Sequence, residues 1–183
     1  YKSAERVANL KLHELDSDFT LIVVPFGSYI ETEGAIRCCT SSWRRIDDTN
    51  IPPRVKISGH YVNSILAKTE AVLAGFDEAI MLDHNGYVAE GTGENLFVIR
   101  GQTIKTPSIT NILGGITRRT AIEILMHNGH EVIETQFGRD ALYVADEIFM
   151  TGTAAEVTPV REVDRREVGD PGPITRMTQD VYL

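Results

Sequence analysis

Short apolar runs recur along this chain, and each is bounded by glycine, proline or asparagine turns. Runs of this length, rich in β-branched and aromatic residues, are typical of strands. The first of them, "FTLIVVPF" (19–26), reads as a buried strand that Pro25 ends. Because few helical segments lie between the runs, the order predicts mixed α/β structure with hairpins, not regular alternation of strand and helix. We expect strands over 19–26, 35–43, 79–83, 87–89, 95–100, 103–106, 130–135 and 147–152, and a closing hairpin from 156–160 and 161–168.

Two longer segments carry the start and stop signals of helices. The segment "SILAKTEAVLAGF" (64–76) has Asn63 or Ser64 as a candidate N-cap and Gly75 near its end. The second segment, "TRRTAIEILMHNG" (117–129), has Thr117 as its candidate N-cap and ends at Gly129. N-cap hydroxyls or amides and terminal glycines satisfy the backbone groups that helix ends leave unpaired. We expect helices over 64–76, 117–129, 138–145 and 174–183.

Other segments are predicted to be irregular. "GSYIETEG" (27–34) reads as a linker or mobile loop, and 44–54 contains Pro52 and Pro53, which exclude regular structure. The "HNG" at 84–86 predicts the turn of a hairpin.

Composition narrows the class of partner and compartment. The chain has 183 residues and a formal net charge of −8, which argues against a nucleic-acid partner. No apolar run approaches the roughly 20 residues that cross a bilayer, and no signal peptide is evident, so we expect no membrane association. Cys38 and Cys39 are adjacent and are expected to be reduced thiols in a cytoplasmic protein. The histidines are scattered without ligand spacing, so no metal site is predicted.

Lys56 follows the Pro-Pro segment and lies between Val55 and Ile57. An apolar setting disfavours the ammonium form and would make the amine nucleophilic. The same pattern also fits a lysine whose stem packs while its head reaches water. The sequence alone leaves both interpretations open.

Three glycine-containing stretches are candidates for ligand binding. "EGTGENLF" (90–97) places two carboxylates ahead of a strand, where they can meet a positive charge. "NILGGITRR" (111–119) enters a helix and can hold a phosphate on backbone N–H groups, or can be a capped helix after a loop. "TGTAAE" (151–156) can present N–H groups to an anion, or can be a tight turn. It has neither a Walker lysine nor Rossmann glycine spacing.

Taken in order, "KISGHYVNS" (56–64), "EGTGENLF" (90–97), "LGGITR" (113–118) and "DEIFMTGTAAEVTPV" (146–160) resemble the class IV pyridoxal-phosphate enzymes. The chain looks most like branched-chain amino acid aminotransferases, from about Phe19 to its C-terminus. The resemblance implies an α/β fold: the large cofactor domain of the D-amino-acid aminotransferase-like type, with a mixed sheet or pseudo-barrel and flanking helices. It also implies the cofactor pyridoxal 5'-phosphate.

The resemblance assigns roles to the residues around the cofactor ring. Lys56 would form the Schiff base with the cofactor aldehyde and move the proton between the substrate and the cofactor. Glu90 would pair with the protonated ring nitrogen, Tyr61 would hydrogen-bond the ring 3-oxygen, and Leu113 would pack on the ring face. Glu94 would lie near the site, with a functional and a structural role both open.

Further roles concern the phosphate and the substrate. Gly115, Ile116 and Thr117 would hold the phosphate at the helix N-terminus, joined by Thr153. The backbone of Thr153 and Ala154 would offer N–H groups to the substrate carboxylate. The implied reaction is ping-pong transamination of branched-chain L-amino acids, with 2-oxoglutarate as the acceptor.

Family members carry a smaller domain ahead of the cofactor domain. Residues 1–28 resemble the tail of that domain, 29–36 the interdomain linker and 37–183 the large domain. Tyr29 lies where the family places a substrate-pocket tyrosine. Without the smaller domain we expect poor transamination, and we expect the assembly to be at least a homodimer. The alternatives are a D-amino-acid aminotransferase, an aminodeoxychorismate lyase, or a non-catalytic fragment used only for binding or assembly.

Overall fold

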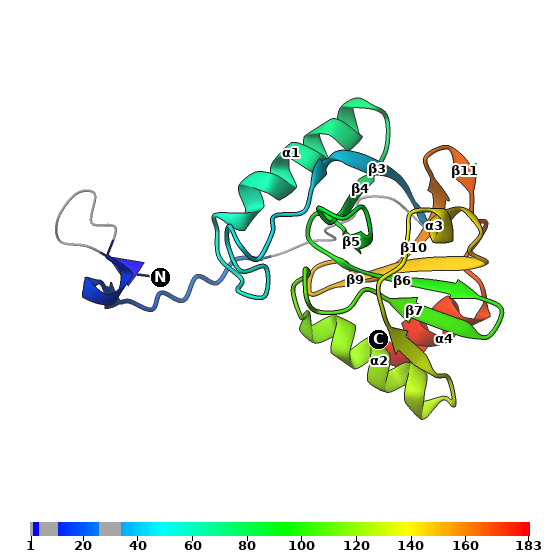
Figure 1. Cartoon of the computed structure of the whole chain (residues 1–183). Helices are drawn as coiled ribbons and strands as arrows, with labels where there is room; N and C mark the ends of the chain where they lie inside the picture. The colour runs from blue at the N-terminus through cyan, green and yellow to red at the C-terminus, as the bar shows by residue number, and fades with distance from the viewer. Residues whose placement is uncertain (1, 4–10, 26–33) are drawn as a thin grey trace.

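The computed structural model describes residues 2–3, 11–25 and 34–183 of the chain (Figure 1). Residues 26–33, which include Tyr29 and most of the expected loop at 27–34, lie outside the described part. The helices are η1 (Leu12–Glu14, 3-10), α1 (His60–Leu73), α2 (Ile116–His127), α3 (Asp140–Tyr143) and α4 (Pro173–Tyr182). The strands are β1 (Lys2–Ser3), β2 (Asp16–Ser17), β3 (Ile36–Arg44), β4 (Glu78–Leu82), β5 (Val88–Glu90), β6 (Asn95–Arg100), β7 (Thr103–Thr106), β8 (Val132–Glu134), β9 (Glu147–Gly152), β10 (Glu156–Val163) and β11 (Arg166–Glu167).

One large mixed sheet organises the described residues from 34 onward. Its strand order is β5-β4-β3-β10-β9-β6-β7-β8, with β11 paired to β10. The pairs β10–β3, β3–β4 and β7–β8 are parallel, and the other pairs are antiparallel. Helix α1 packs on β3 and β4, whereas α2 and α4 pack together on β9 (Figure 1). The expected mixed α/β sheet with flanking helices is therefore confirmed.

The sheet curls, and the curl places the loops that matter below. β5 begins the strand order and β6 stands sixth in it, yet only residues 91–94 join them. The backbone N–H of Gly91 donates to the carbonyl of Glu94 at 2.7 Å, which makes this connection tight. Two strands so far apart in the order can meet only if the sheet bends round on itself.

The core lies on both sides of this sheet. On one side Phe97 and Phe149 stack with ring centroids 4.7 Å apart, beneath α2 and α4. On the α1 side Ala67 and Ala71 pack against Met81 and Cys39. Cys39 and its neighbour are both free thiols, as expected.

Most expected strands are present with end shifts of one or two residues, but the first is wrong. Residues 19–25 form no regular structure, and the large side chains there are exposed, from 62% for Val24 to 89% for Phe19. An apolar run becomes a buried strand only where a neighbouring strand accepts its hydrogen bonds. The described residues place none beside this segment, which extends away from the large sheet (Figure 1).

The predicted helix starts are also corrected. Helix α1 begins at His60 with Gly59 as N-cap, not at Asn63 or Ser64. Helix α2 has Gly115 as N-cap without a side-chain cap, so Thr117 lies inside the first turn. Side-chain caps were expected because hydroxyl and amide residues stand near both starts, but the preceding turns begin each helix earlier.

The closing hairpin is present with a later turn. β10 continues through residues 161–163, and the turn is at Asp164 and Arg165, both with positive φ. The hairpin at 84–86 is confirmed, with Gly86 at φ +88°. None of the helices in the described part of the chain has the length and apolar character needed to cross a lipid bilayer.

Candidate functional site

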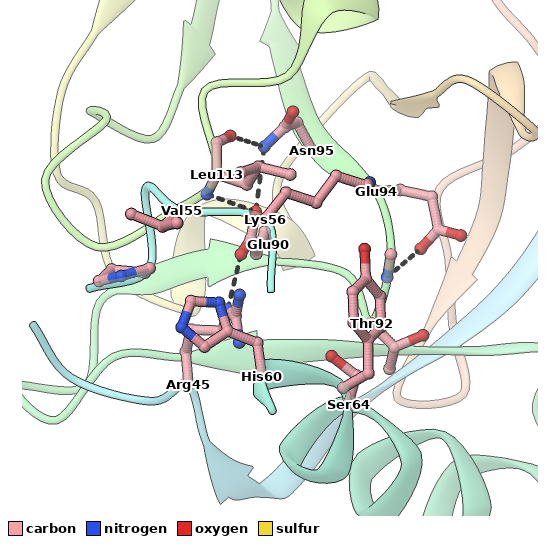
Figure 2. A pocket seen from close by; sticks show the side chains of 13 residues that line it. Arg45, Val55, Lys56, His60, Ser64, Glu90, Thr92, Glu94, Asn95 and Leu113 are labelled. Carbon is pink, nitrogen blue, oxygen red and sulfur yellow. Dashed lines mark hydrogen bonds and ion pairs between the residues drawn. The ribbon is translucent and has the colours of Figure 1, made fainter. Parts of the chain in front are cut away.

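An open pocket lies where four segments of the chain meet (Figure 2). The segments are the connection from β3 to α1, the first turns of α1, the β5–β6 turn and the loop before α2. The lining residues are Arg45, Pro53, Val55, Lys56, His60, Tyr61, Ser64, Glu90, Thr92, Gly93, Glu94, Asn95 and Leu113.

Glu90 presents a buried carboxylate to this pocket. Its side chain accepts hydrogen bonds from Arg45 Nε at 2.6 Å, Asn95 Nδ2 at 3.1 Å and the Leu113 backbone N–H at 3.1 Å. Burial raises the pKa of Glu90, while the Arg45 guanidinium acts to lower it. A carboxylate has about four lone-pair sites. One site is therefore left to accept from a further donor, such as a ring N–H.

Two buried nitrogen atoms of the pocket wall have no partner within the described structure. These are Nη1 of Arg45 and Nε2 of His60. Burial, and to a lesser degree the Arg45 charge, lowers the pKa of His60, so its imidazole is neutral near pH 7. Unpaired buried donors and acceptors are costly, so they point to a site that a polar ligand or water completes.

Lys56 lies at the open side of the pocket. Its Nζ is 5.8 Å from the ring centroid of Tyr61, and its charge acts to lower the pKa of Glu90. Of the two settings that the sequence leaves open for this lysine, the described residues do not show the apolar enclosure, because Val55 is 50% and Ile57 is 40% exposed. The lysine is exposed, and its side chain lies among those that line the pocket (Figure 2).

Asn95 connects the start of α2 with the pocket. The amide of Asn95 donates to both Glu90 and the Leu113 carbonyl, and a Cβ on Gly115 would lie 2.2 Å from Asn95 Oδ1. With no side-chain cap, the first N–H groups of α2 are free of a capping side chain and can bind an anion. Ile116 is exposed and Thr117 is buried, and neither lines the pocket of Figure 2.

The turn after β9 lies beside the β5–β6 turn. A Cβ on Gly152 would be 3.4 Å from the Gly93 carbonyl and 3.6 Å from Glu94 Cγ. Thr153 and Ala154 follow directly and are exposed. Their backbone is therefore near the pocket but not part of its lining.

Of the residues predicted from sequence, Lys56, Tyr61, Glu90, Glu94 and Leu113 line one pocket. Gly115 is not in the lining but lies against Asn95, which is. The lining does not include Ile116, Thr117, Thr153 or Ala154. Tyr29 lies outside the described residues.

Sequence reasoning missed Arg45, His60 and Asn95. Asn95 and His60 stand inside motifs already singled out. Arg45 had only one signal, a basic residue directly after a strand in an acidic chain. In the described ranges, no group of three or more His, Cys, Asp or Glu side chains could hold a metal ion.

Comparison with known proteins gives a consistent result. The family described as amino-transferase class IV matches residues 4–163. A "Probable branched-chain-amino-acid aminotransferase" of Aquifex aeolicus is 50% identical over 177 residues, which cover 94% of this chain and 57% of that protein. The chain thus spans little more than half the length of this relative.

Solved structures agree. The branched-chain aminotransferase of the archaeon Thermoproteus uzoniensis, solved with norvaline, has a TM-score of 0.93 and 42% identity, covering all of this chain and 61% of that one. The branched-chain amino acid aminotransferase of Thermobaculum terrenum, solved in its PLP-bound holo-form, has a TM-score of 0.82 and 44% identity, covering 86% and 53%.

Proposed function

Because the chain belongs to the class IV aminotransferase family, we propose that it binds pyridoxal 5'-phosphate and is the cofactor-binding part of a branched-chain amino acid aminotransferase. Enzymes of this class use that cofactor. The observation that carries the proposal is the shared pocket of Lys56 and Glu90, in which a primary amine and a buried, anchored carboxylate face the same space. The amino donors are proposed to be leucine, isoleucine and valine, and the acceptor 2-oxoglutarate.

The residues fit the cofactor. Glu90 has one acceptor site left for the ring N–H, Arg45 and His60 offer unpaired polar atoms, and the start of α2 is uncapped. When bound, pyridoxal phosphate supplies a ring that accepts electrons released at the α-carbon of an amino acid.

Each residue contributes positioning or proton transfer. We assign to the Lys56 amine the covalent attachment of the cofactor and the movement of the α-proton. Glu90 holds the ring nitrogen in its protonated form by charge and hydrogen bonding. Tyr61 orients the ring from α1, and Leu113, whose N–H binds Glu90, packs against the ring face.

We assign the binding of the two anionic groups, the cofactor phosphate and the substrate carboxylate, mainly to backbone N–H groups. Gly115, Ile116 and Thr117 hold the phosphate at the α2 N-terminus, with Thr153. The N–H groups of Thr153 and Ala154 receive the substrate carboxylate. Tyr29 is assigned to the side-chain pocket.

Three broader assignments complete the proposal. We assign the tail of a small domain to residues 1–28, a linker to residues 29–36 and the cofactor domain to residues 37–183. A homodimer is proposed by family likeness. A cytoplasmic location agrees with the two buried free thiols.

Borohydride trapping tests the proposal. Pyridoxal phosphate is added, the protein is reduced, and peptide mass spectrometry locates the adduct. We expect it on Lys56, with none in Lys56→Arg and an unchanged adduct in the control Lys105→Arg. No adduct on the parent protein would favour a non-catalytic fragment. The full-length protein should aminate 2-oxoglutarate from L-leucine, and a preference for D-alanine would contradict the branched-chain assignment.

A further inference from the structure

Three buried carboxylates surround the turn that joins β5 to β6. Glu78 is 3%, Glu90 5% and Glu94 4% exposed. They belong to β4, to the end of β5 and to the turn itself. Grouping three acids in the interior is unfavourable unless each is paired with a cation or kept neutral.

Two of the three acids have cation partners. Arg45 Nε donates to Glu90 at 2.6 Å, and Lys68 Nζ donates to Glu78 at 2.6 Å. The ion pairs of the described residues include none with Glu94, whose carboxylate instead accepts from the Gly93 backbone N–H at 3.0 Å (Figure 2).

The Glu94 side chain folds back over its own turn. A Cβ on Gly91 would lie 2.8 Å from Glu94 Oε2, and one on Gly152 would lie 3.6 Å from Glu94 Cγ. The side chain therefore fills the space between the β5–β6 turn and the end of β9. Thr92 fixes the same turn from the other side, by donating to Glu78 at 2.7 Å.

We propose that Glu94 is a positioning residue, and that its neutral carboxyl group holds the β5–β6 turn in the form that presents Glu90 to the pocket. Ionisation of Glu94 would loosen this turn and weaken cofactor binding. The cofactor part of this inference rests on the proposed function.

The burial of Glu94 and the charges around it disfavour its ionised form. The pKa of Glu94 is raised to about 7, mostly by burial and next by the negative charge of Glu78. Glu90 acts in the same direction, whereas the Gly93 N–H and the Lys68 charge oppose it. Cys38, on the neighbouring β3, contributes no charge, because burial raises the pKa of its thiol well above its usual range.

The turn transmits the effect to the pocket. Glu90 precedes it and Asn95 follows it, and the Asn95 amide holds both Glu90 and the Leu113 carbonyl. An ionised Glu94 would draw water or a cation into the turn, because an unpaired buried carboxylate is costly. Displacement of the turn would then shift both residues that flank it.

Hydrogen exchange on the cofactor-free chain tests the turn directly. Exchange of the amides at 91–94, corrected for intrinsic rates, is measured at pH 6 and pH 8 in the parent, in Glu94→Gln and in the control Glu123→Gln. If the turn opens and releases Glu94 to its ordinary pKa, the corrected exchange rate should rise about tenfold from pH 6 to pH 8 in the parent and in the control. Glu94→Gln should show no such increase. Protected amides in β9 and β10 verify that each protein is folded.

Pyridoxal phosphate binding tests the consequence. The dissociation constant of the parent, divided by that of Glu94→Gln, should rise by up to about tenfold from pH 6 to pH 8, because Glu94 changes from mostly neutral to mostly ionised. Dividing the two constants removes the pH dependence that the two proteins share. The role of Glu94 would be overturned if the ratio of dissociation constants were the same at pH 6 and pH 8. It would also be overturned if exchange at 91–94 rose equally with pH in the parent and in Glu94→Gln. Absence of binding by all three proteins at both pH values would overturn the proposed function, and hydrogen exchange would still decide the behaviour of the turn.

Discussion

The Nε of Arg45 donates to Oε1 of Glu90 at 2.6 Å, and both side chains are almost fully buried. Arg45 follows β3 and Glu90 ends β5, two strands that do not neighbour each other in the sheet because β4 lies between them. The ion pair therefore spans β4 at the edge of the pocket and fixes the direction of the carboxylate.

Arg45→Met should destabilise the protein strongly. Removing one partner of a buried ion pair leaves an uncompensated charge, which typically costs about 3–5 kcal/mol. We expect a loss of this order in the free energy of unfolding, measured by urea denaturation. The control is Arg119→Met, whose partner Glu123 is 3.9 Å away in an exposed pair, and which should leave the midpoint unchanged. Similar midpoints for both variants would contradict the structural role of Arg45.

Gly115→Ala should disturb the pocket, whereas Gly114→Ala should not. The new methyl group at Gly115 would lie 2.2 Å from Asn95 Oδ1, while none of the surrounding atoms comes within 4 Å at Gly114. Overpacking of this kind costs about 1–3 kcal/mol. We expect that loss in thermal or urea unfolding for Gly115→Ala, together with weaker pyridoxal phosphate binding. A change of less than about 0.5 kcal/mol is expected for Gly114→Ala.

Glu147→Ala should fray α4 from its N-terminus. The Glu147 carboxylate, at the start of β9, accepts from the backbone N–H groups of Thr175 at 2.7 Å and Ile174 at 3.3 Å. Losing this cap leaves buried donors unsatisfied, at a cost of about 1–3 kcal/mol. Faster hydrogen exchange at 174–178 would be the measured result, and the exposed Glu131→Ala serves as control. Equal exchange in the two variants would exclude the capping role.

Glu94→Gln should change how stability depends on pH. Burial raises the pKa of Glu94 from an ordinary 4.5 to about 7, so the unfolded chain releases this proton before the folded protein does. The parent therefore loses stability as pH rises from about 4.5 to about 7, and not beyond. Over this window the stability of Glu94→Gln relative to the parent should increase by up to about 3 kcal/mol. Urea denaturation at pH 4.5, 6, 7 and 8 measures it, and parallel curves would contradict the assignment.

Much of the local structure could be predicted from the sequence. Short apolar runs gave nearly all strands of the large sheet, and glycines marked turns such as Gly86 and Gly75, both with positive φ. These features depend on neighbours in the chain, so local patterns carry them. Residues 19–25 show the limit, because an apolar run does not reveal whether another strand lies beside it.

The site was predictable in its motifs but not in its contacts. Lys56, Glu90 and Leu113 were identified from the family resemblance, and they line one pocket. Arg45, which holds Glu90, was missed because its partner lies 45 residues away. Of the two settings left open for Lys56, the structure shows the one in which its neighbours Val55 and Ile57 are exposed, which the sequence could not decide because chain neighbours do not define exposure.

The amino-acid sequence by itself determined the order of strands and helices, the family, and the acidic and glycine-rich turns, since each depends on residues close together in the chain. Only the tertiary structure decided which distant groups meet. The curl of the sheet brings the end of β5 against β6, so that Arg45, Asn95 and Leu113 converge on Glu90. It also decided that Glu94 is buried beside other acids, because burial and charge follow from packing across strands and not from neighbours in sequence.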